Sequence, residues 1–170
     1  MSTVWTRLAR WRVPLGFVVA AAAFALASPT RRSALIGLAI ALPGEALRIW
    51  ASGHIDKGRE ITRSGPYRYV RHPLYAGSAI MGVGFVTAAG NWIVAALVLA
   101  YLGLTIAAAM RTEEATLDSR FAGAYTAYRE GRAAPVDRRF SWARVVANRE
   151  YRAIAGFALG AALLMLRSTR

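Results

Sequence analysis

One apolar run constrains the fold of this chain more than any other feature. It extends from Pro73 to Met110 and is broken only at Gly90-Asn91. At about 1.5 Å per residue, one helix of that length would be much longer than the roughly 30 Å hydrocarbon core of a bilayer. The run therefore predicts a hairpin of two membrane helices, over 73–89 and 91–110.

Three further apolar stretches extend this to a multi-pass pattern, at 12–28, 33–50 and 151–167. The basic N-terminus followed by apolar residues is similar to a signal peptide, but the later apolar runs favour a retained first span. We expect residues 1–170 to form a single all-α membrane domain of about five transmembrane helices. Small residues in the third span are expected to allow close helix packing: Gly77, Gly82 and Gly84.

Composition supports this class of protein. The chain is 56% hydrophobic with a formal net charge of +13, whereas a basic nucleic-acid-binding domain is rarely so apolar. It contains no Cys, which excludes disulfides, thiol nucleophiles and cysteine zinc clusters. Of the metal-binding residue types that remain, none forms a motif, so no metal site is predicted.

The distribution of positive charge predicts the orientation. With five spans, 18 of the 22 Lys and Arg residues lie on the side of the N-terminus, the 51–72 loop (with Arg48) and the 111–152 segment, and 4 lie on the other. The positive-inside rule then places the N-terminus and both large loops in the cytoplasm, with the spans in the cell (inner or plasma) membrane. Four spans would change this balance little. Because topology explains the arginines, no nucleic-acid partner is expected.

Reactive side chains gather at two places on that side. The first is the segment Gly65-Pro-Tyr-Arg-Tyr-Val-Arg-His-Pro-Leu-Tyr-Ala-Gly77, in which the prolines predict irregular backbone up to a helix start at Pro73. The second is Arg111-Thr-Glu-Glu114, at the end of the fourth span. The hairpin brings these helix ends together, so His72 and Glu113 are expected to line a small-molecule pocket. Alternatively, the two glutamates form an ordinary solvated helix face.

Two other regions allow two interpretations each. Glu45 and Arg48 share one face of the second span, either as a buried structural pair or as part of the site. The apolar and Arg residues of 140–149 predict a short amphipathic helix in the headgroup region, or else a solvated loop. Between these regions, residues 112–128 have helical character, with aromatic side chains near one face.

Several of these motifs together resemble the isoprenylcysteine carboxyl methyltransferase family, which is itself similar to the phospholipid N-methyltransferases. The matching residues are Gly65-Pro-Tyr67, Arg71-His-Pro-Leu-Tyr75, Gly77, Glu113-Glu114, Leu117, Phe121, Tyr125 and Tyr128, within roughly 40–130. The resemblance implies an integral-membrane, all-helical methyltransferase that uses S-adenosyl-L-methionine. It would methylate a lipidic or prenylated small-molecule acceptor at the cytoplasmic interface, surrounded by membrane lipids.

The resemblance also implies which residues act. The cofactor-binding set would be Glu60, Ile61, Thr62, Tyr67, Arg71, His72, Pro73, Leu74, Tyr75 and Glu113. Aromatic walls suit the adenine ring, a carboxylate suits the ribose hydroxyls and the ammonium group, and a cationic donor suits the methionine carboxylate. The candidate catalytic residues are His72, Arg111 and Glu114.

One position departs from the family pattern. The family arginine associated with the acceptor, one helical turn before the first glutamate, is Ala109 here. The nearest arginine, Arg111, is rotated by about 200° on a helix. The acceptor is therefore open: a carboxylate needs no general base, whereas an amine would need one such as Glu114 or His72. The alternatives are a phospholipid or amine N-methyltransferase, a membrane NADPH-dependent sterol or isoprenoid reductase on a related scaffold, and a non-catalytic membrane subunit.

Overall fold

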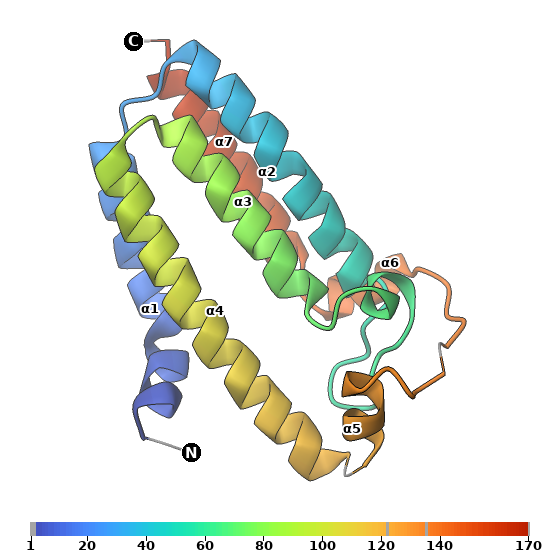
Figure 1. The fold of residues 1–170 in the computed structure, drawn as a ribbon. Helices are drawn as coiled ribbons and strands as arrows, with labels where there is room; N and C mark the ends of the chain where they lie inside the picture. The colour runs from blue at the N-terminus through green and yellow to red at the C-terminus, as the bar shows by residue number, and fades with distance from the viewer. Residues whose placement is uncertain (1–2, 122, 135, 170) are drawn as a thin grey trace.

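A computed structural model describes residues 3–121, 123–134 and 136–169, with side chains from Trp11 onward except that of residue 12. The arginines at 7, 10, 12 and 170 that enter the charge count lie outside these described side chains. Within the described residues all regular secondary structure is helical, as predicted. The helices are α1 (Thr3–Leu26), α2 (Arg31–Ser52), the 3-10 helix η1 (Gly65–Arg68), α3 (Pro73–Ala89), α4 (Trp92–Arg120), α5 (Ala124–Arg129), α6 (Trp142–Ala147) and α7 (Tyr151–Arg167) (Figure 1).

Five long helices coincide with the five predicted spans: α1, α2, α3, α4 and α7. Among the described residues, α2 and α4 are long and apolar enough to cross a membrane, while α3 and the Val13–Leu26 part of α1 are shorter apolar helices. Large apolar side chains are exposed on all five long helices, for example Phe17, Leu42, Val83, Leu104 and Leu166. An outward-facing apolar surface of this extent is typical of contact with lipid.

The α2 and α3 helices pack in direct backbone contact. A Cβ atom on Gly84 would lie 2.5 Å from the Gly37 carbonyl oxygen, and one on Gly77 would lie 2.6 Å from the Gly44 carbonyl oxygen. No side chain larger than hydrogen fits at these points, so the glycines set the helix separation. The prediction of a close-packing surface on α3 is confirmed, although Gly82 faces Leu102 of α4 instead of α2.

The predicted break at Gly90-Asn91 is the turn between α3 and α4. Gly90 ends α3 in the left-handed region, with φ of 61°. The Asn91 side chain then caps α4, accepting hydrogen bonds from the backbone N–H groups of Ile93 (2.9 Å) and Val94 (3.3 Å). Its amide nitrogen donates to the Leu26 carbonyl oxygen at 2.9 Å, which ties the end of α1 to the same turn.

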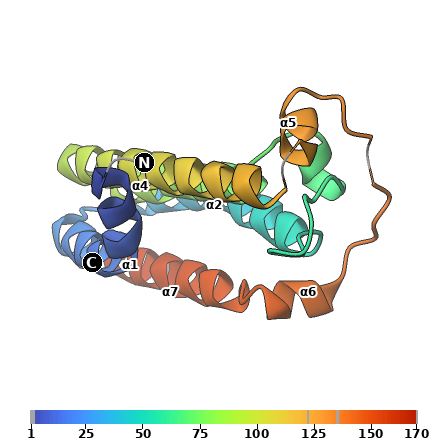
Figure 2. The same cartoon turned by 90° about the horizontal axis from the view of Figure 1, so that it is seen from below.

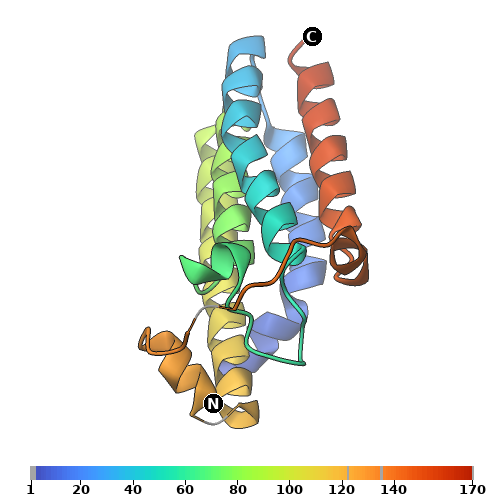
Figure 3. The same ribbon diagram turned by 90° about the vertical axis from the view of Figure 1, so that its right-hand side faces the viewer.

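The helical character predicted over 112–128 is divided between two helices. The α4 helix continues to Arg120, and α5 begins at Ala124 after Gly123, whose φ is 77°. The left-handed conformation at Gly123 ends the straight path and turns the chain back, so that α5 lies beside η1 (Figure 2). The predicted short helix within 140–149 is present as α6, next to the start of α7 (Figure 3).

Candidate functional site

The η1, α5 and α6 helices cluster at one end of the bundle, which we call the loop end (Figure 3). Gly65 starts η1 with φ of 55°, and a Cβ there would lie 2.6 Å from the His54 ring. Because His54 Nδ1 also contacts the Trp50 carbonyl oxygen at 2.9 Å, the end of α2 fixes the position of η1. As a result Tyr67 of η1 is buried against Ala51, Ile55 and Leu74.

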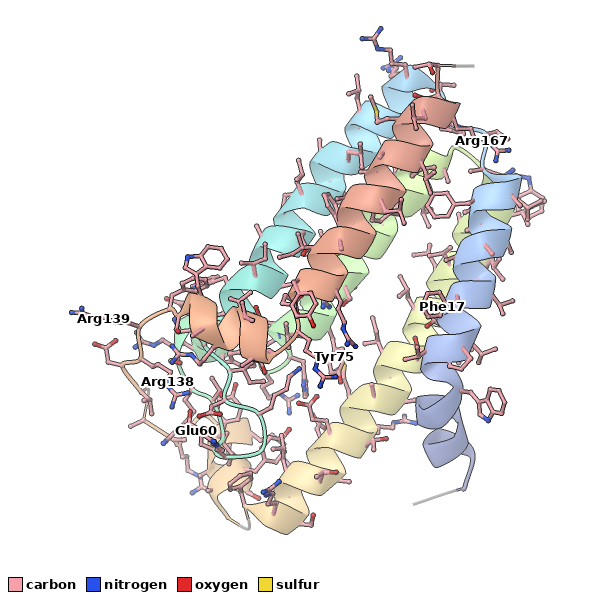
Figure 4. The ribbon with its side chains drawn as sticks, turned by 180° about the vertical axis from the view of Figure 1, so that it is seen from behind. Phe17, Glu60, Tyr75, Arg138, Arg139 and Arg167 are labelled. Atoms are coloured by element: carbon pink, nitrogen blue, oxygen red, sulfur yellow. The ribbon has the colours of Figure 1, made fainter. Side chains whose placement is uncertain are left out.

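A cavity of about 370 Å³ opens at the loop end, and we call it the loop-end cavity. Its walls come from the loop before η1, from η1, from the start of α3, from α4 and from α5. It brings together eight of the residues implied by the sequence: Glu60, Ile61, Thr62, Tyr67, Arg71, His72, Tyr75 and Glu113. Figure 4 shows Tyr75 and Glu60 at this end of the molecule.

His72 is oriented by Glu114, across the ends of α3 and α4. The His72 Nε2 group lies 3.0 Å from Glu114 Oε1, and Arg71 Nη1 lies 3.6 Å from the same oxygen. The hydrogen bond from His72, supported by the positive charge of Arg71, holds the pKa of Glu114 below its ordinary value despite partial burial. Glu114 itself does not line the cavity, so its ionised carboxylate fixes the His72 ring that does.

Tyrosines form much of the remaining wall. Burial raises the pKa of Tyr67, and burial together with the Glu114 carboxylate raises the pKa of Tyr125 to about 12. Both phenols therefore stay protonated at neutral pH and can donate hydrogen bonds. The Tyr128 hydroxyl donates to the Tyr67 carbonyl oxygen at 2.8 Å and joins α5 to η1 over the cavity.

A second, inner cavity of about 310 Å³ lies deeper in the bundle and shares Tyr67, His72, Tyr75, Ala109 and Glu113 with the first. Two residues of the implied cofactor set, Pro73 and Leu74, line this inner cavity instead of the loop-end cavity. Ala109 lines both, whereas Arg111 is exposed on α4 and lines neither.

The inner cavity also has a buried ion pair at its far end. Arg48 Nη2 lies 2.7 Å from Glu150 Oε1, while the predicted Glu45–Arg48 contact is longer, with 3.9 Å between Arg48 Nε and Glu45 Oε2. Arg48 and Glu150 both line the inner cavity. The sequence allowed Arg48 to be either part of a buried structural pair or part of the site. Its position in the wall of the inner cavity agrees with a place in the site.

Sequence reasoning missed part of this site. The loop-end cavity also has walls from Lys57, Thr116 and Arg120, and α5 adds Tyr125 and Tyr128. The spacing of the two tyrosines on one helix face was visible in the sequence, but nothing local indicated that α5 would turn back. Glu60 also has a role outside the cavity, in a 2.7 Å ion pair with Arg138 that holds the segment after α5 against the loop (Figure 4).

The residues present fit S-adenosyl-L-methionine by their chemistry. The cavity volume lies within the range of small-molecule sites, about 300–1,000 Å³. Glu113 supplies acceptor oxygens, Arg71 supplies a cationic donor, and Tyr67 and Phe121 supply aromatic walls. Among the described residues, no group of three or more His, Cys, Asp or Glu side chains is placed to hold a metal ion.

Comparison with known families agrees with this arrangement. Residues 15–124 match the family described as phospholipid methyltransferase. The match covers α1 from residue 15, the whole of α2, α3 and α4, and the loop-end cavity up to the start of α5. The chain belongs to the phospholipid methyltransferase family. The family description agrees with the membrane methyltransferase that the sequence predicts. The activity of this chain and the isoprenylcysteine-type assignment stay predictions.

A curated relative in the comparison is the cobalt-zinc-cadmium resistance protein CzcN of Cupriavidus metallidurans. It is 33% identical over 127 residues, which cover 68% of this phospholipid methyltransferase family chain. The aligned region spans 56% of the length of the relative. No solved structure matches the chain.

Proposed function

We propose that this chain is an S-adenosyl-L-methionine-dependent methyltransferase of the cell membrane, similar to isoprenylcysteine carboxyl O-methyltransferases. In this proposal α1, α2, α3, α4 and α7 are five transmembrane helices of one domain, and the loop end faces the cytoplasm. The observation that carries the proposal is the convergence of His72, Arg71, Tyr67 and Glu113 on one cavity at the end of the α3–α4 hairpin. A lipidic or prenylated acceptor would reach this cavity from the bilayer, and the cofactor from the cytosol.

The cofactor would be held by the walls of the loop-end cavity. In this proposal Glu113 accepts hydrogen bonds from ribose hydroxyls or from the ammonium group, and Arg71 binds the methionine carboxylate. When bound, S-adenosyl-L-methionine supplies an electrophilic methyl group, whose bond to sulfur breaks as the acceptor's electron pair forms the new bond and a neutral thioether remains. Tyr75 and Tyr67 offer π faces that stabilise a neighbouring positive charge.

The protein's contribution to rate would be placement and exclusion of water. A carboxylate acceptor is already ionised, so no side chain has to remove a proton. The Glu114–His72 hydrogen bond fixes the ring at the mouth shared by the two cavities, and the Tyr128–Tyr67 hydrogen bond keeps α5 over the loop end. Both contacts serve to hold the acceptor and the methyl donor in line.

Binding of S-adenosylhomocysteine tests the cofactor site. We expect His72→Ala and Glu113→Gln to weaken its affinity by about tenfold or more, because each removes a polar partner within an enclosed cavity. The matched control is Glu130→Gln, whose carboxylate pairs with Arg132 at the surface. Calorimetric titration of purified wild-type protein that shows no binding, or equal binding in all three variants, would contradict the proposal.

The family description favours a second candidate, transfer to a phospholipid amine. An amine must lose a proton before or during attack, and His72, held by Glu114, is the side chain best placed to take it. A transfer assay with labelled S-adenosyl-L-methionine distinguishes the two candidates. An S-farnesylcysteine derivative is the acceptor for the first, and phosphatidylethanolamine for the second. NADPH consumption in the same assay would instead indicate the reductase alternative, and cofactor binding without transfer to either lipid would indicate a non-catalytic subunit.

A further inference from the structure

A third and larger cavity, of about 440 Å³, lies among α1, α3, α4 and α7, and we call it the apolar cavity. Its walls are almost entirely apolar, with Val19, Phe24, Phe85, Val98 and Leu164 among them. The described lining includes three polar side chains: Arg48, Ser78 and Tyr101. All three also line the inner cavity, so the apolar cavity is polar only at the boundary that the two share.

The three cavities follow one another along α4. This helix contributes Glu113 to the loop-end cavity, Thr105 to the inner cavity and Val94 to the far part of the apolar cavity. At about 1.5 Å per residue, Glu113 and Val94 are roughly 28 Å apart along the helix axis. A single extended molecule with a polar head and an apolar tail matches both the length and the polarity of this path.

Charged and polar side chains gather at the boundary between the inner and apolar cavities. Arg48 pairs with Glu150, donates to Ser78, and has Glu45 on its other side. Glu45 and Glu150 are each only 5% exposed, and neither Glu45 oxygen makes a hydrogen bond with a described residue. Polar atoms buried in this way carry an energetic cost. Arg48 Nε and Glu150 Oε1 also make no hydrogen bond with a described residue, and because both residues line the inner cavity, a ligand group there can relieve that cost.

The backbone before Glu150 is strained to place this carboxylate. Arg149 has φ of 58°, a left-handed conformation that is uncommon for a side chain other than glycine. Glu150 and the whole of α7 also lie beyond residues 15–124, the part of the chain that matches the family. This wall of the apolar cavity is therefore supplied by a segment outside the shared family region.

The apolar cavity opens sideways between α1 and α7. Ala20 of α1 and Gly156 of α7 both line the cavity and are both exposed. At the end away from the loops, Arg167 of α7 donates hydrogen bonds to the carbonyl oxygens of Phe24 (2.6 Å) and Ala25 (3.1 Å) and holds the two helices together (Figure 4). The opening thus lies at the level of apolar helix surface, where lipid chains would surround it.

We propose that the apolar cavity binds one hydrocarbon chain of the methyl acceptor, which enters from the bilayer between α1 and α7, and that the Arg48–Glu150 pair binds the polar end of that chain. This inference rests on the proposed function for the identity of the ligand as the acceptor. A cavity of about 150 Å³ takes up benzene, so this one, at about 440 Å³, has room for a single hydrocarbon chain. Acceptor selection would then depend on α7 and Glu150 as much as on the shared cofactor site.

Photo-crosslinking of the full-length protein in detergent tests the site without requiring turnover. The probe is palmityl alcohol with a diazirine at the chain end, whose neutral head avoids a bias from charge. We expect the crosslinks to fall on the lining of α4 and α7. We expect Gly156→Leu to reduce them by about tenfold, because its side chain would occupy space that is open in the structure.

The matched control is Gly103→Leu, since Gly103 is also an exposed helix glycine with no atom near its Cβ position but does not line the apolar cavity. Ala20→Leu, on the opposite side of the opening, provides a second blocking variant should Gly156→Leu fail to fold. Equal labelling in the blocking and control variants, or labelling spread over the outer helix faces, would overturn the proposal.

A second measurement addresses the polar end. With an S-farnesylcysteine derivative as acceptor, we expect Glu150→Gln to change the acceptor KM by about fivefold or more while S-adenosylhomocysteine affinity stays within about twofold. An unchanged acceptor KM in Glu150→Gln would show that the pair only supports the fold. Failure of S-adenosylhomocysteine to bind wild-type protein would refute the proposed function and leave the crosslinking result to judge the apolar cavity separately.

Discussion

At the scale of single residues, the two adjacent glutamates of α4 have different tasks. Glu114 is engaged by His72 and Arg71 outside the cavity wall, while Glu113 lines both polar cavities. Neighbours on a helix point about 100° apart, so one can orient a side chain of α3 while the other faces a ligand. This division separates a positioning role from a binding role within a single pair.

Glu114→Gln tests the positioning role through its pH dependence. Because the pKa of Glu114 is lowered in the folded state, its ionised form stabilises the fold above the ordinary value of 4.5, and this contribution is lost as pH falls through the lowered pKa. We expect the wild type to exceed Glu114→Gln by about 1 kcal/mol in free energy of unfolding near neutral pH. Chemical unfolding at a series of pH values should show this difference vanish well below 4.5.

The control is the same measurement on Glu130→Gln. An exposed ion pair such as Glu130–Arg132 contributes little to the free energy of unfolding. If the difference in free energy of unfolding between wild type and Glu114→Gln persists unchanged in acid, the positioning role of the ionised Glu114 is contradicted.

The sequence could predict only some of these residue contacts. The hairpin placed His72 near Glu113 and Glu114, because a turn at Gly90-Asn91 aligns the far ends of its helices. The sequence could not predict whether Glu113 or Glu114 would contact His72, because this depends on the length of α3 and on the rotation of α4 about its axis. The Arg48–Glu150 pair joins distant segments, and its formation depends on the turn at Arg149, for which the sequence carries no signal.

At the scale of helices, long apolar runs were predictable and the return of the chain after α4 was not. The length of an apolar run predicts α2, α3 and α7 to within a few residues. The predicted spans miss the polar start of α1, which begins at Thr3, and the polar end of α4, which continues to Arg120. The α5 helix instead depends on one left-handed glycine, Gly123, and on the hydrogen bond between Tyr128 and η1. Such contacts form only after the rest of the bundle is in place, so local sequence patterns do not reveal them.

The α2–α3 contact gives a prediction at this scale. Gly84→Leu would force a side chain against the backbone of Gly37 and Ala41, and we expect it to lower the free energy of unfolding by about 3 kcal/mol. Gly103→Leu on α4 makes the same chemical change in open space and should leave stability nearly unchanged. Thermal unfolding of both variants in detergent measures the difference, and similar midpoints would show that the close approach is not required.

At the scale of the whole molecule, the chain begins and ends on opposite sides of the bundle. The α1 helix starts at the loop end and α7 finishes at the other end, which agrees with the odd number of crossings that we propose (Figure 1). The charged loops lie together at the loop end, which agrees with the asymmetry of Lys and Arg in the sequence. These two features support the proposed five-span topology and its orientation.

Single cysteines test this topology, because the natural chain has none. We expect Arg139→Cys, at the loop end, to react with a membrane-impermeant maleimide only after cells are opened. Thr30→Cys, between α1 and α2, should react in intact cells. Labelling of both from the same side would exclude the proposed arrangement.

The direct contact between the α2 and α3 backbones has a mechanical consequence. At Gly37, Gly44, Gly77 and Gly84 the backbone of one helix lies directly against the other helix, so we expect the two helices to move as one rigid body. Arg48 on α2 and Ser78 on α3 belong to that body, and His72 sits at its edge, so we expect the distance from Arg48 to His72 to stay constant. Because Glu150 holds the start of α7 to Arg48, the widening needed for the proposed lipid entry would come from α1, as a hinge motion about the hydrogen bonds of Arg167.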